Sequence, residues 1–368
     1  MPIRFNSRLA SIPGYTPGVP KGKSATDVAS SNLAQLASNE SPFPPLPDVV
    51  EAVAAAAASM NRYPDPAVSD LRGALAEEHG VDPDEVLVAN GSCEVLLAAA
   101  EAQLEPGTSV LYSWPAFSMY PILAPLAGSD EIRVPLAAGE VHDLDAMADA
   151  LTDSTRLVLV CNPNNPTATY RDAASIAAFV ESVPDDVTVI LDEAYIDFDT
   201  GDDPAASVEL FRSHPNLVLL RTFSKAHSLA GFRVGYAICS PEFRAATEAV
   251  RQPFSVNALA QTAARESLRH ADAIAERIAM VVAERDRVQA ALAGLGLGCT
   301  DSKTNFSWVS LGEDGPAIEE RVVSEMAGAG VVVRPGRLLG GPGHLRISYG
   351  TREENDRMIA SLEAALRN

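Results

Sequence analysis

The sequence predicts an α/β fold, in which a mostly parallel sheet is covered by helices and is followed by a smaller α+β unit. Between residues 86 and 220, short apolar runs alternate with helical patterns. The runs are apolar at consecutive positions, as strands buried on both faces require. Beyond residue 300 the order of strands and helices changes, which indicates the second unit.

The individual elements follow from hydrophobic periodicity. Helices are expected at residues 49–60 and 68–79, from residue 94, at 258–295 and 316–329, and after residue 353. Strands are expected at 86–88, 110–112, 156–160, 187–191, 217–220, 305–309, 331–333 and 345–347. We therefore expect an N-terminal arm at 1–45, a large domain at 46–260, and a small domain at 261–368 that includes the long linking helix.

Length and charge restrict the class of protein. A chain of 368 residues is long enough to bury two hydrophobic cores. Its formal net charge of -21 argues against binding to nucleic acid or to anionic membranes, because both need a positive surface. The apolar runs are too short to span a bilayer, and the first residues lack the apolar segment of a secretory signal. We therefore expect a cytoplasmic protein.

Cysteine and histidine spacing gives no support for a metal site. The four cysteines lie far apart and form no CxxC pair, which is typical of free thiols in a reducing compartment. The six histidines show no HxxxH or HxH spacing. We expect no bound metal.

Lys225 is the most informative single residue. Of the 28 basic residues only four are lysines, and Lys225 comes five residues after the end of the strand-like run at 217–220. A guanidinium stays protonated near neutral pH, whereas burial and nearby cations lower the pKa of a lysine. An amine at the end of a buried strand is therefore a candidate nucleophile that forms a Schiff base with an aldehyde cofactor.

The ends of the other expected strands also carry polar or glycine-rich segments, and ligands bind beyond the carboxyl ends of parallel strands. Taken singly, these segments also fit plain helix caps or rigid turns. They are Asn90-Gly91-Ser92-Cys93, residues 161–167 around Asn165, Asp192 to Tyr195, and Ser224-Lys225 with Arg233 eight residues later.

Together these segments supply the groups that bind pyridoxal phosphate. The aldehyde needs a lysine, and the pyridine nitrogen needs a carboxylate that keeps it protonated. The ring oxygen needs donors such as asparagine and tyrosine. The phosphate needs backbone N–H groups, hydroxyls and a cation, and a turn that opens a helix offers the first of these.

Seven stretches of the chain are similar to a known family. The chain resembles the fold-type-I pyridoxal-phosphate aminotransferases of the histidinol-phosphate aminotransferase family, close to their aromatic branch. The resemblance covers nearly the whole length and implies a mostly parallel seven-stranded sheet and a homodimer to which the arm contributes contacts. The supporting stretches are residues 36–42, 61–65, 162–167, 192–195, 221–226, 229–236 and 345–348.

The resemblance implies a role for each cofactor residue. Lys225 would form the Schiff base and carry the proton, and Asp192 would pair with the ring nitrogen. Asn165 and Tyr195 would bond the 3′-oxygen, and Tyr195 is grouped with the catalytic residues. The phosphate would be held by Ser92, Cys93, Ser224 and Arg233, the ring would stack on Phe117, and Tyr63 would reach the phosphate in the partner subunit.

The resemblance also implies a set of substrate residues. Arg346 would bind the acidic end of the substrate. Helpers would be Asn39, Tyr15, Arg334, Arg337 and the Asn305-Phe306 pair. Alternative interpretations stay open, since Phe117 and Phe306 also fit plain core positions and the two helper arginines also fit ion pairs. Glu193 and Asp197, beside the Asp192 motif, are expected to be simple loop or helix-face charges.

Two positions depart from the family pattern. Ala168-Thr169 stands where the family has glycine after the NPNNPT string, and His227-Ser228 stands where it has an aromatic residue and glycine. A left-handed backbone at Ala168 would cost about 1 kcal/mol or more, so we expect the local turn to differ.

Three functions are compatible with these residues. The first expectation is histidinol-phosphate:2-oxoglutarate aminotransfer in histidine biosynthesis, because residues 343–350 resemble that branch. The alternative is aromatic amino-acid aminotransfer, because residues 12–18 resemble the aromatic branch. A decarboxylase, lyase or oxidase on the same scaffold is the third interpretation, motivated by Ala168 and His227. In the first two cases the partners are an amino donor and a 2-oxo acid.

Overall fold

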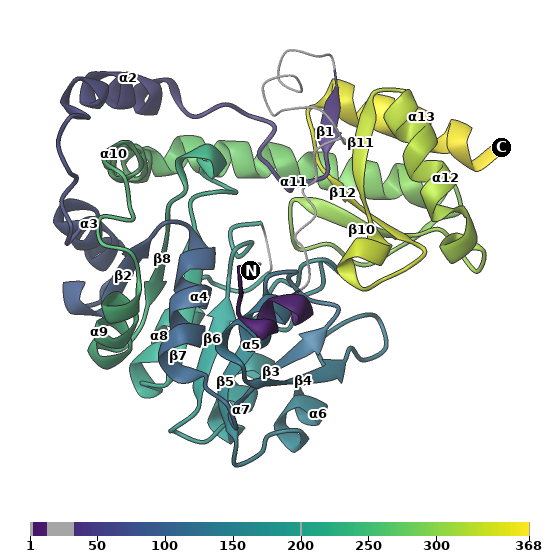
Figure 1. The fold of residues 1–368 in the computed structure, drawn as a ribbon. Helices are drawn as coiled ribbons and strands as arrows, with labels where there is room; N and C mark the ends of the chain where they lie inside the picture. Colours follow the sequence, from purple (N-terminus) through teal and green to yellow (C-terminus); the bar gives the residue numbers. More distant parts are fainter. Residues whose placement is uncertain (1–2, 13–32, 199–200, 368) are drawn as a thin grey trace.

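A computed structural model describes residues 3–12, 33–198 and 201–367. Figure 1 shows a large α/β body, a smaller sheet packed with helices, and a long helix that runs between them. Tyr15 and most of the segment at 12–18 lie outside the described residues. Among the described residues, no helix is both long and apolar enough to cross a membrane.

The larger sheet has seven strands in the order β2-β8-β7-β6-β5-β3-β4. Neighbouring strands are parallel except for β8, which is antiparallel to both β2 and β7. The expected mostly parallel seven-stranded sheet is thereby confirmed. Its strands are β2 (Val86–Ala89), β3 (Ser109–Trp114), β4 (Asp130–Pro135), β5 (Thr155–Cys161), β6 (Thr188–Asp192), β7 (Leu217–Thr222) and β8 (Gly235–Ile238).

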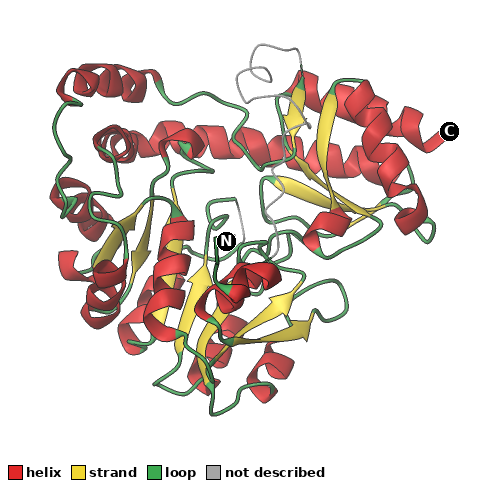
Figure 2. Ribbon diagram, in the orientation of Figure 1, coloured by secondary structure: helices red, strands yellow, loops and turns green. Residues whose placement is uncertain are grey.

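Successive residues of the strands other than the edge strand β4 enter two different cores. On β5, Leu157 and Leu159 face one core, whereas Val158 and Val160 face the other. Consecutive apolar residues are therefore needed because both faces are covered. Helices α4 (Ser92–Gln103), α5 (Tyr120–Ala127) and α9 (Pro241–Val250) cover one face, and α3 (Ser69–His79), α6 (Leu144–Asp149), α7 (Ala173–Ser182) and α8 (Ala206–Ser213) supply the other (Figure 2).

Two strands of this sheet escape sequence-based reasoning. Strand β4 is an edge strand whose residues are mostly exposed, so it lacks an apolar run. Strand β8 begins at Gly235 inside a glycine-rich segment. A Cβ at Gly235 would lie 2.7 Å from the backbone nitrogen of Ser92, so glycine is needed there for the close approach of β8 to the start of α4.

The smaller sheet has five strands in the order β1-β11-β12-β10-β9. Only the β1–β11 pair is parallel. Strand β1 comes from the N-terminal segment, so the chain closes this sheet with residues far apart in sequence. The strands are β1 (Ala34–Leu36), β9 (Gly298–Cys299), β10 (Phe306–Ser310), β11 (Val331–Pro335) and β12 (His344–Ser348), and α12 (Gly315–Gly328) and α13 (Arg352–Arg367) pack on them.

The prediction of one continuous helix at 258–295 is wrong. The structure has α10 (Ala258–Ser267), a 3₁₀ turn η5 (Leu268–His270) and α11 (Ala271–Gly294). The His270 backbone leaves the helical region, and its ring lies 3.2 Å from the Glu266 carboxylate and 3.5 Å from that of Asp48 on α2 (Pro47–Ala56). No glycine or proline marks this break.

The described part of the N-terminal arm contacts both bodies. Its 3₁₀ turn η1 (Ser7–Ser11) packs on α5, where Arg8 donates a hydrogen bond of 3.2 Å to the carbonyl of Leu126. Further along, β1 joins the smaller sheet. The two described parts of the arm therefore lie against different bodies.

Candidate active site

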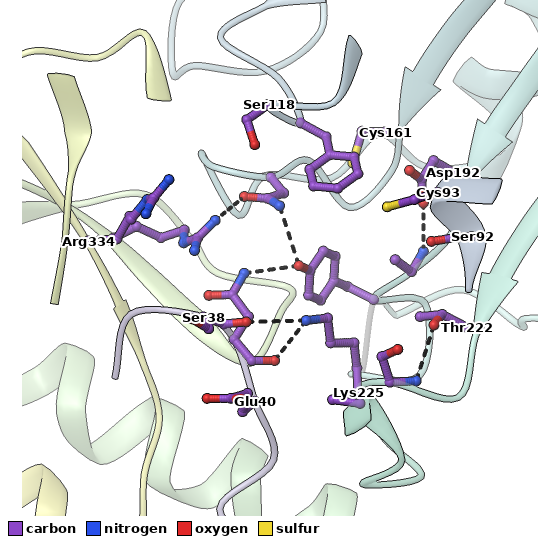
Figure 3. A pocket seen from close by; sticks show the side chains of 18 of the residues that line it. Ser38, Glu40, Ser92, Cys93, Ser118, Cys161, Asp192, Thr222, Lys225 and Arg334 are labelled. Carbon is purple, nitrogen blue, oxygen red and sulfur yellow. Dashed lines mark hydrogen bonds between the residues drawn. The ribbon is translucent and has the colours of Figure 1, made fainter. Parts of the chain in front are cut away.

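A cavity of about 400 Å³ lies at the carboxyl ends of the parallel strands, between the two sheets. Figure 3 shows that its wall is built from both bodies: Ser92, Asp192 and Lys225 come from the larger one and Arg334 from the smaller. Its volume and its mixture of charged and aromatic side chains are typical of a small-molecule site. The strand-end location agrees with the prediction.

Lys225 follows β7 and projects into this cavity. Its Nζ donates hydrogen bonds to the carbonyl oxygens of Asn39 (3.0 Å) and Ser38 (3.3 Å). Burial, followed by the positive charge of Arg346, lowers the pKa of Lys225 to about 8. The amine is therefore neutral in an appreciable fraction of molecules under mildly alkaline conditions, as a nucleophile or base must be.

Asp192 ends β6 and is 2% exposed. Its Oδ2 accepts a hydrogen bond of 3.1 Å from the hydroxyl of Tyr120, and its Oδ1 accepts one of 3.3 Å from the backbone of Ala194. Burial raises the pKa of Asp192 to about 6. A cationic partner in the cavity would stabilise its ionised form, and the nitrogen of a protonated pyridine is such a partner.

Tyr195 lies at the centre of an amide network. Its hydroxyl accepts hydrogen bonds from the side-chain amides of Asn39 (2.9 Å) and Asn165 (3.4 Å). The side-chain oxygen Oδ1 of Asn165 accepts a hydrogen bond of 2.7 Å from Arg346 Nη1. The predicted oxygen-binding pair is thus brought together, and Asn39 is placed with it.

The start of α4 and Arg233 converge at one end of the cavity. The first turn of α4 offers backbone N–H groups at Ser92 and Cys93, which have no helical partners. Gly91 has φ +75°, and a Cβ there would clash with the guanidinium of Arg233. Arg233 Nη1 lies 3.4 Å from Ser224 Oγ. Glycine thus allows a cation, a hydroxyl and a helix end to converge, and this donor set fits a phosphate monoester.

Arg346 and Arg334 lie side by side on the wall formed by the smaller sheet. They face each other across β11 and β12 and are 7% and 5% exposed. Arg346 donates a bond of 2.7 Å to the carbonyl of Ala37 as well as that to Asn165. Two guanidinium groups against one cavity suit a carboxylate or a second anion. Arg337 lies outside the cavity lining and pairs with Glu319 and Glu320.

Three other predicted residues lie in different places. Phe117 lines the cavity, as a residue that stacks on a ring must. Phe306 is fully buried behind the cavity. Its ring packs edge-on against that of Tyr195, with the ring centroids 5.2 Å apart. Tyr63 is 82% exposed and stacks on Phe254 with ring centroids 4.7 Å apart, so it takes no part in the cavity of its own chain.

Both departures from the family pattern keep a left-handed backbone. Ala168 has φ +61° and is fully buried, so the expectation of a different turn is wrong. Hydrogen bonds on both sides hold it, from its own nitrogen to Asn164 (2.8 Å) and from the nitrogen of Lys303 to its carbonyl (2.9 Å). Ser228 also has φ +61°, and its hydroxyl bonds that of Ser41 at 2.8 Å.

A buried ion pair lies beside the cavity. Glu193, expected to be a simple loop or helix-face charge, is instead buried and accepts a bond of 2.8 Å from Arg221 Nε. Glu193 directly follows Asp192, and Arg221 lies four residues before Lys225. The pair therefore connects the two strand ends that carry the central residues of the site.

Comparison with known proteins identifies the family. A family model described as aminotransferase class I and II matches residues 31–362. The chain belongs to the class I and II aminotransferase family. It is a pyridoxal-phosphate-dependent aminotransferase, whose substrates are amino acids and 2-oxo acids. The donor set described above fits that cofactor.

Several relatives align over nearly the whole aminotransferase chain. Proteins from Streptomyces coelicolor and Thermobifida fusca, both named aromatic amino acid aminotransferase, are each 44% identical to it. The first alignment covers 96% of this chain and 95% of the relative, and the second covers 97% and 96%.

Solved structures confirm the aminotransferase fold. Histidinol-phosphate aminotransferase from Sinorhizobium meliloti, in complex with pyridoxal-5′-phosphate, has a TM-score of 0.88 at 28% identity and covers 99% of this chain and 98% of its own. Aspartate aminotransferase from Thermus thermophilus with maleate has a TM-score of 0.85 at 26% identity, covering 99% and 100%.

Some aminotransferase site residues escape sequence-based reasoning. Tyr120, which bonds Asp192, starts an apolar helix and reads as core. Ser118 and Leu339 also line the cavity but belong to no motif, and Thr222 lines it from the stretch at 221–226 without a predicted role. Only the proximity of Ser118 to Phe117 and of Thr222 to Lys225 could have indicated them.

Proposed function

We propose that the chain is an aromatic amino-acid aminotransferase that uses 2-oxoglutarate as amino acceptor. The observation that carries this proposal is the 44% identity, over nearly full length, to relatives named aromatic amino acid aminotransferase. These relatives favour the sequence-based alternative over the first expectation. A decarboxylase, lyase or oxidase finds no support among them.

The roles proposed for the cavity residues follow from their contacts. Pyridoxal phosphate, when bound, supplies an electron sink for the bond broken at the substrate's Cα. Lys225, neutral in part at mildly alkaline pH, takes and returns the Cα proton. Asp192 holds the charge on the ring nitrogen, Asn165 and Tyr195 orient the ring, and the start of α4 with Arg233 holds the phosphate. Arg346 binds the substrate carboxylate.

Histidinol phosphate remains a second candidate because of one structural feature. Arg334 lies beside Arg346, so the cavity wall has two guanidinium groups. Both could bind the phosphate group of a phosphate monoester. The solved structure from Sinorhizobium meliloti bears the name of this activity.

A substrate panel tests the choice. With 2-oxoglutarate as acceptor, we expect kcat/KM to be at least about tenfold higher for phenylalanine and tyrosine than for histidinol phosphate. This ratio corresponds to a difference of about 1.4 kcal/mol in transition-state binding. The opposite order would refute the proposal. Release of CO₂ during the half-reaction would instead indicate the decarboxylase alternative.

We also propose a homodimer, completed by Tyr63 of each chain at the phosphate of the other. Tyr63 supports this because its exposed ring is ordered by stacking on Phe254, itself 41% exposed. Tyr63→Phe should weaken retention of pyridoxal phosphate while sedimentation still gives the mass of a dimer. A monomeric wild-type protein would refute the assembly. The cytoplasmic location stays a prediction.

A further inference from the structure

The loop between β11 and β12 places an apolar side chain in the cavity wall. This loop consists of the 3₁₀ turn η6 (Gly336–Leu339) and residues 340–343. Leu339 is 2% exposed and lines the cavity. It is the only branched aliphatic residue among the described residues of the cavity lining, because the others are polar, aromatic, glycine, alanine or cysteine.

The loop is fixed at both ends by one buried carboxylate. Glu319 on α12 is 1% exposed and accepts hydrogen bonds from the backbone nitrogens of Arg337 (3.0 Å) and Gly343 (2.8 Å). A buried carboxylate that accepts hydrogen bonds from backbone N–H groups fixes the position of the loop. Leu339, which lies between these two anchors, is therefore presented on a preorganised support.

The loop also contacts the larger domain. Gly340 has φ +92°, and a Cβ there would lie 2.5 Å from the indole ring of Trp114. Trp114 begins the segment that continues to Phe117 and Ser118, both in the cavity lining. Because Leu339 precedes Gly340 directly, it joins the cavity wall beside this segment.

We propose that Leu339 is the contact that selects an apolar, aromatic side chain of the amino donor. This inference rests on the proposed function and names the residue that gives it. Arg346 binds the carboxylate that all amino-acid substrates share, so it does not distinguish an aromatic donor from glutamate. An aromatic side chain binds best against an apolar surface from which water is excluded. Leu339 is a large apolar side chain of the cavity wall to which no role in cofactor binding is assigned.

The test compares two half-reactions of the holoenzyme. Leu339→Ala removes the apolar contact, and Leu339→Asn replaces it with a polar group of similar size. We expect kcat/KM for phenylalanine to fall by at least about tenfold in Leu339→Ala and further in Leu339→Asn, because loss of a methylene contact alone is worth about tenfold or more. The value for glutamate should stay within about threefold of wild type. Leu339→Met should keep most of the phenylalanine activity.

Leu338→Ala is the matched control. Leu338 is the preceding residue of the same turn and is 43% exposed, so its truncation should leave the ratio of the two substrates unchanged. An equal fall for phenylalanine and glutamate in Leu339→Ala would show a merely structural residue and overturn the inference. An unchanged ratio in both Leu339 variants would overturn it too. A wild-type enzyme inactive on aromatic donors would instead overturn the proposed function, and the inference with it.

Discussion

Breaking the buried ion pair should destabilise the protein strongly. Arg221 and Glu193 have side chains that are 9% and 2% exposed and lie 2.8 Å apart. The change Glu193→Gln removes the negative charge while it keeps the size of the side chain. The Arg221 guanidinium stays protonated. It keeps hydrogen bonds to two neutral acceptors, the Pro204 carbonyl at 2.9 Å and the Ser207 hydroxyl at 3.2 Å.

The size of the effect follows from this uncompensated charge. Removing one partner of a buried ion pair costs about 3–5 kcal/mol. Because two neutral acceptors remain for Arg221, we expect the lower end, about 3 kcal/mol, for Glu193→Gln. In the double variant with Arg221→Met neither member of this pair is left without its partner, although Asp197 and Glu78 lose the favourable charge of Arg221. The two changes should therefore be less than additive, with a coupling of about 1–3 kcal/mol.

Urea unfolding measures both quantities. The wild type, two single variants and the double variant are compared at one protein concentration with excess pyridoxal phosphate. Glu209→Gln is the matched control, since the Glu209–Arg212 pair is 66% and 45% exposed and should contribute less than about 1 kcal/mol. A cost below about 1 kcal/mol for Glu193→Gln, or additivity within about 0.5 kcal/mol, would refute the reasoning.

Three further outcomes are expected. Lys225→Ala should abolish transamination and the absorbance band of the Schiff base that Lys225 forms, whereas Lys303→Ala, which removes a partly exposed lysine, should retain both. Burial raises the pKa of Asp192 from 3.8 to about 6, so the folded apoprotein holds more protons than the unfolded chain between these values and loses stability as pH rises through them. Asp192→Asn should therefore stabilise the apoprotein above pH 6, by up to about 3 kcal/mol in urea unfolding, and should not do so at pH 4. Gly91→Ala should weaken pyridoxal phosphate binding at least about tenfold in a titration, because its Cβ displaces Arg233; unchanged affinity would contradict the proposed phosphate site.

The parts of the site that sequence reasoning found share one property. Asp192 ends a buried strand, Asn165 and Lys225 follow buried strands, and strand ends in a parallel sheet converge on one edge. Tyr120 at a helix start hydrogen-bonds Asp192, and Leu339 on a loop lines the cavity. No local pattern separates them from core residues, because only tertiary packing sets their distance from the site.

The fold was predictable to a similar extent. Consecutive apolar residues identified the central strands because both of their faces are buried. The exposed edge strand β4 lacks that pattern. The break at η5 was missed because every residue around it tolerates a helix, and tertiary contacts of His270 with Glu266 and Asp48 accompany the change of direction.

The turn at Thr167-Ala168 also bears on motion. The Thr300 hydroxyl donates to the Thr167 carbonyl at 2.5 Å, and the Lys303 nitrogen donates to that of Ala168 at 2.9 Å. Both donors belong to the segment that leads into β10 of the smaller sheet. A rotation of the smaller domain that preserved these bonds would have its axis close to this turn. Residues near the axis would barely move. Arg346, which joins Asn165 of this turn to Ala37 at the end of β1, would keep its contacts through such a rotation better than the more distant parts of the smaller domain.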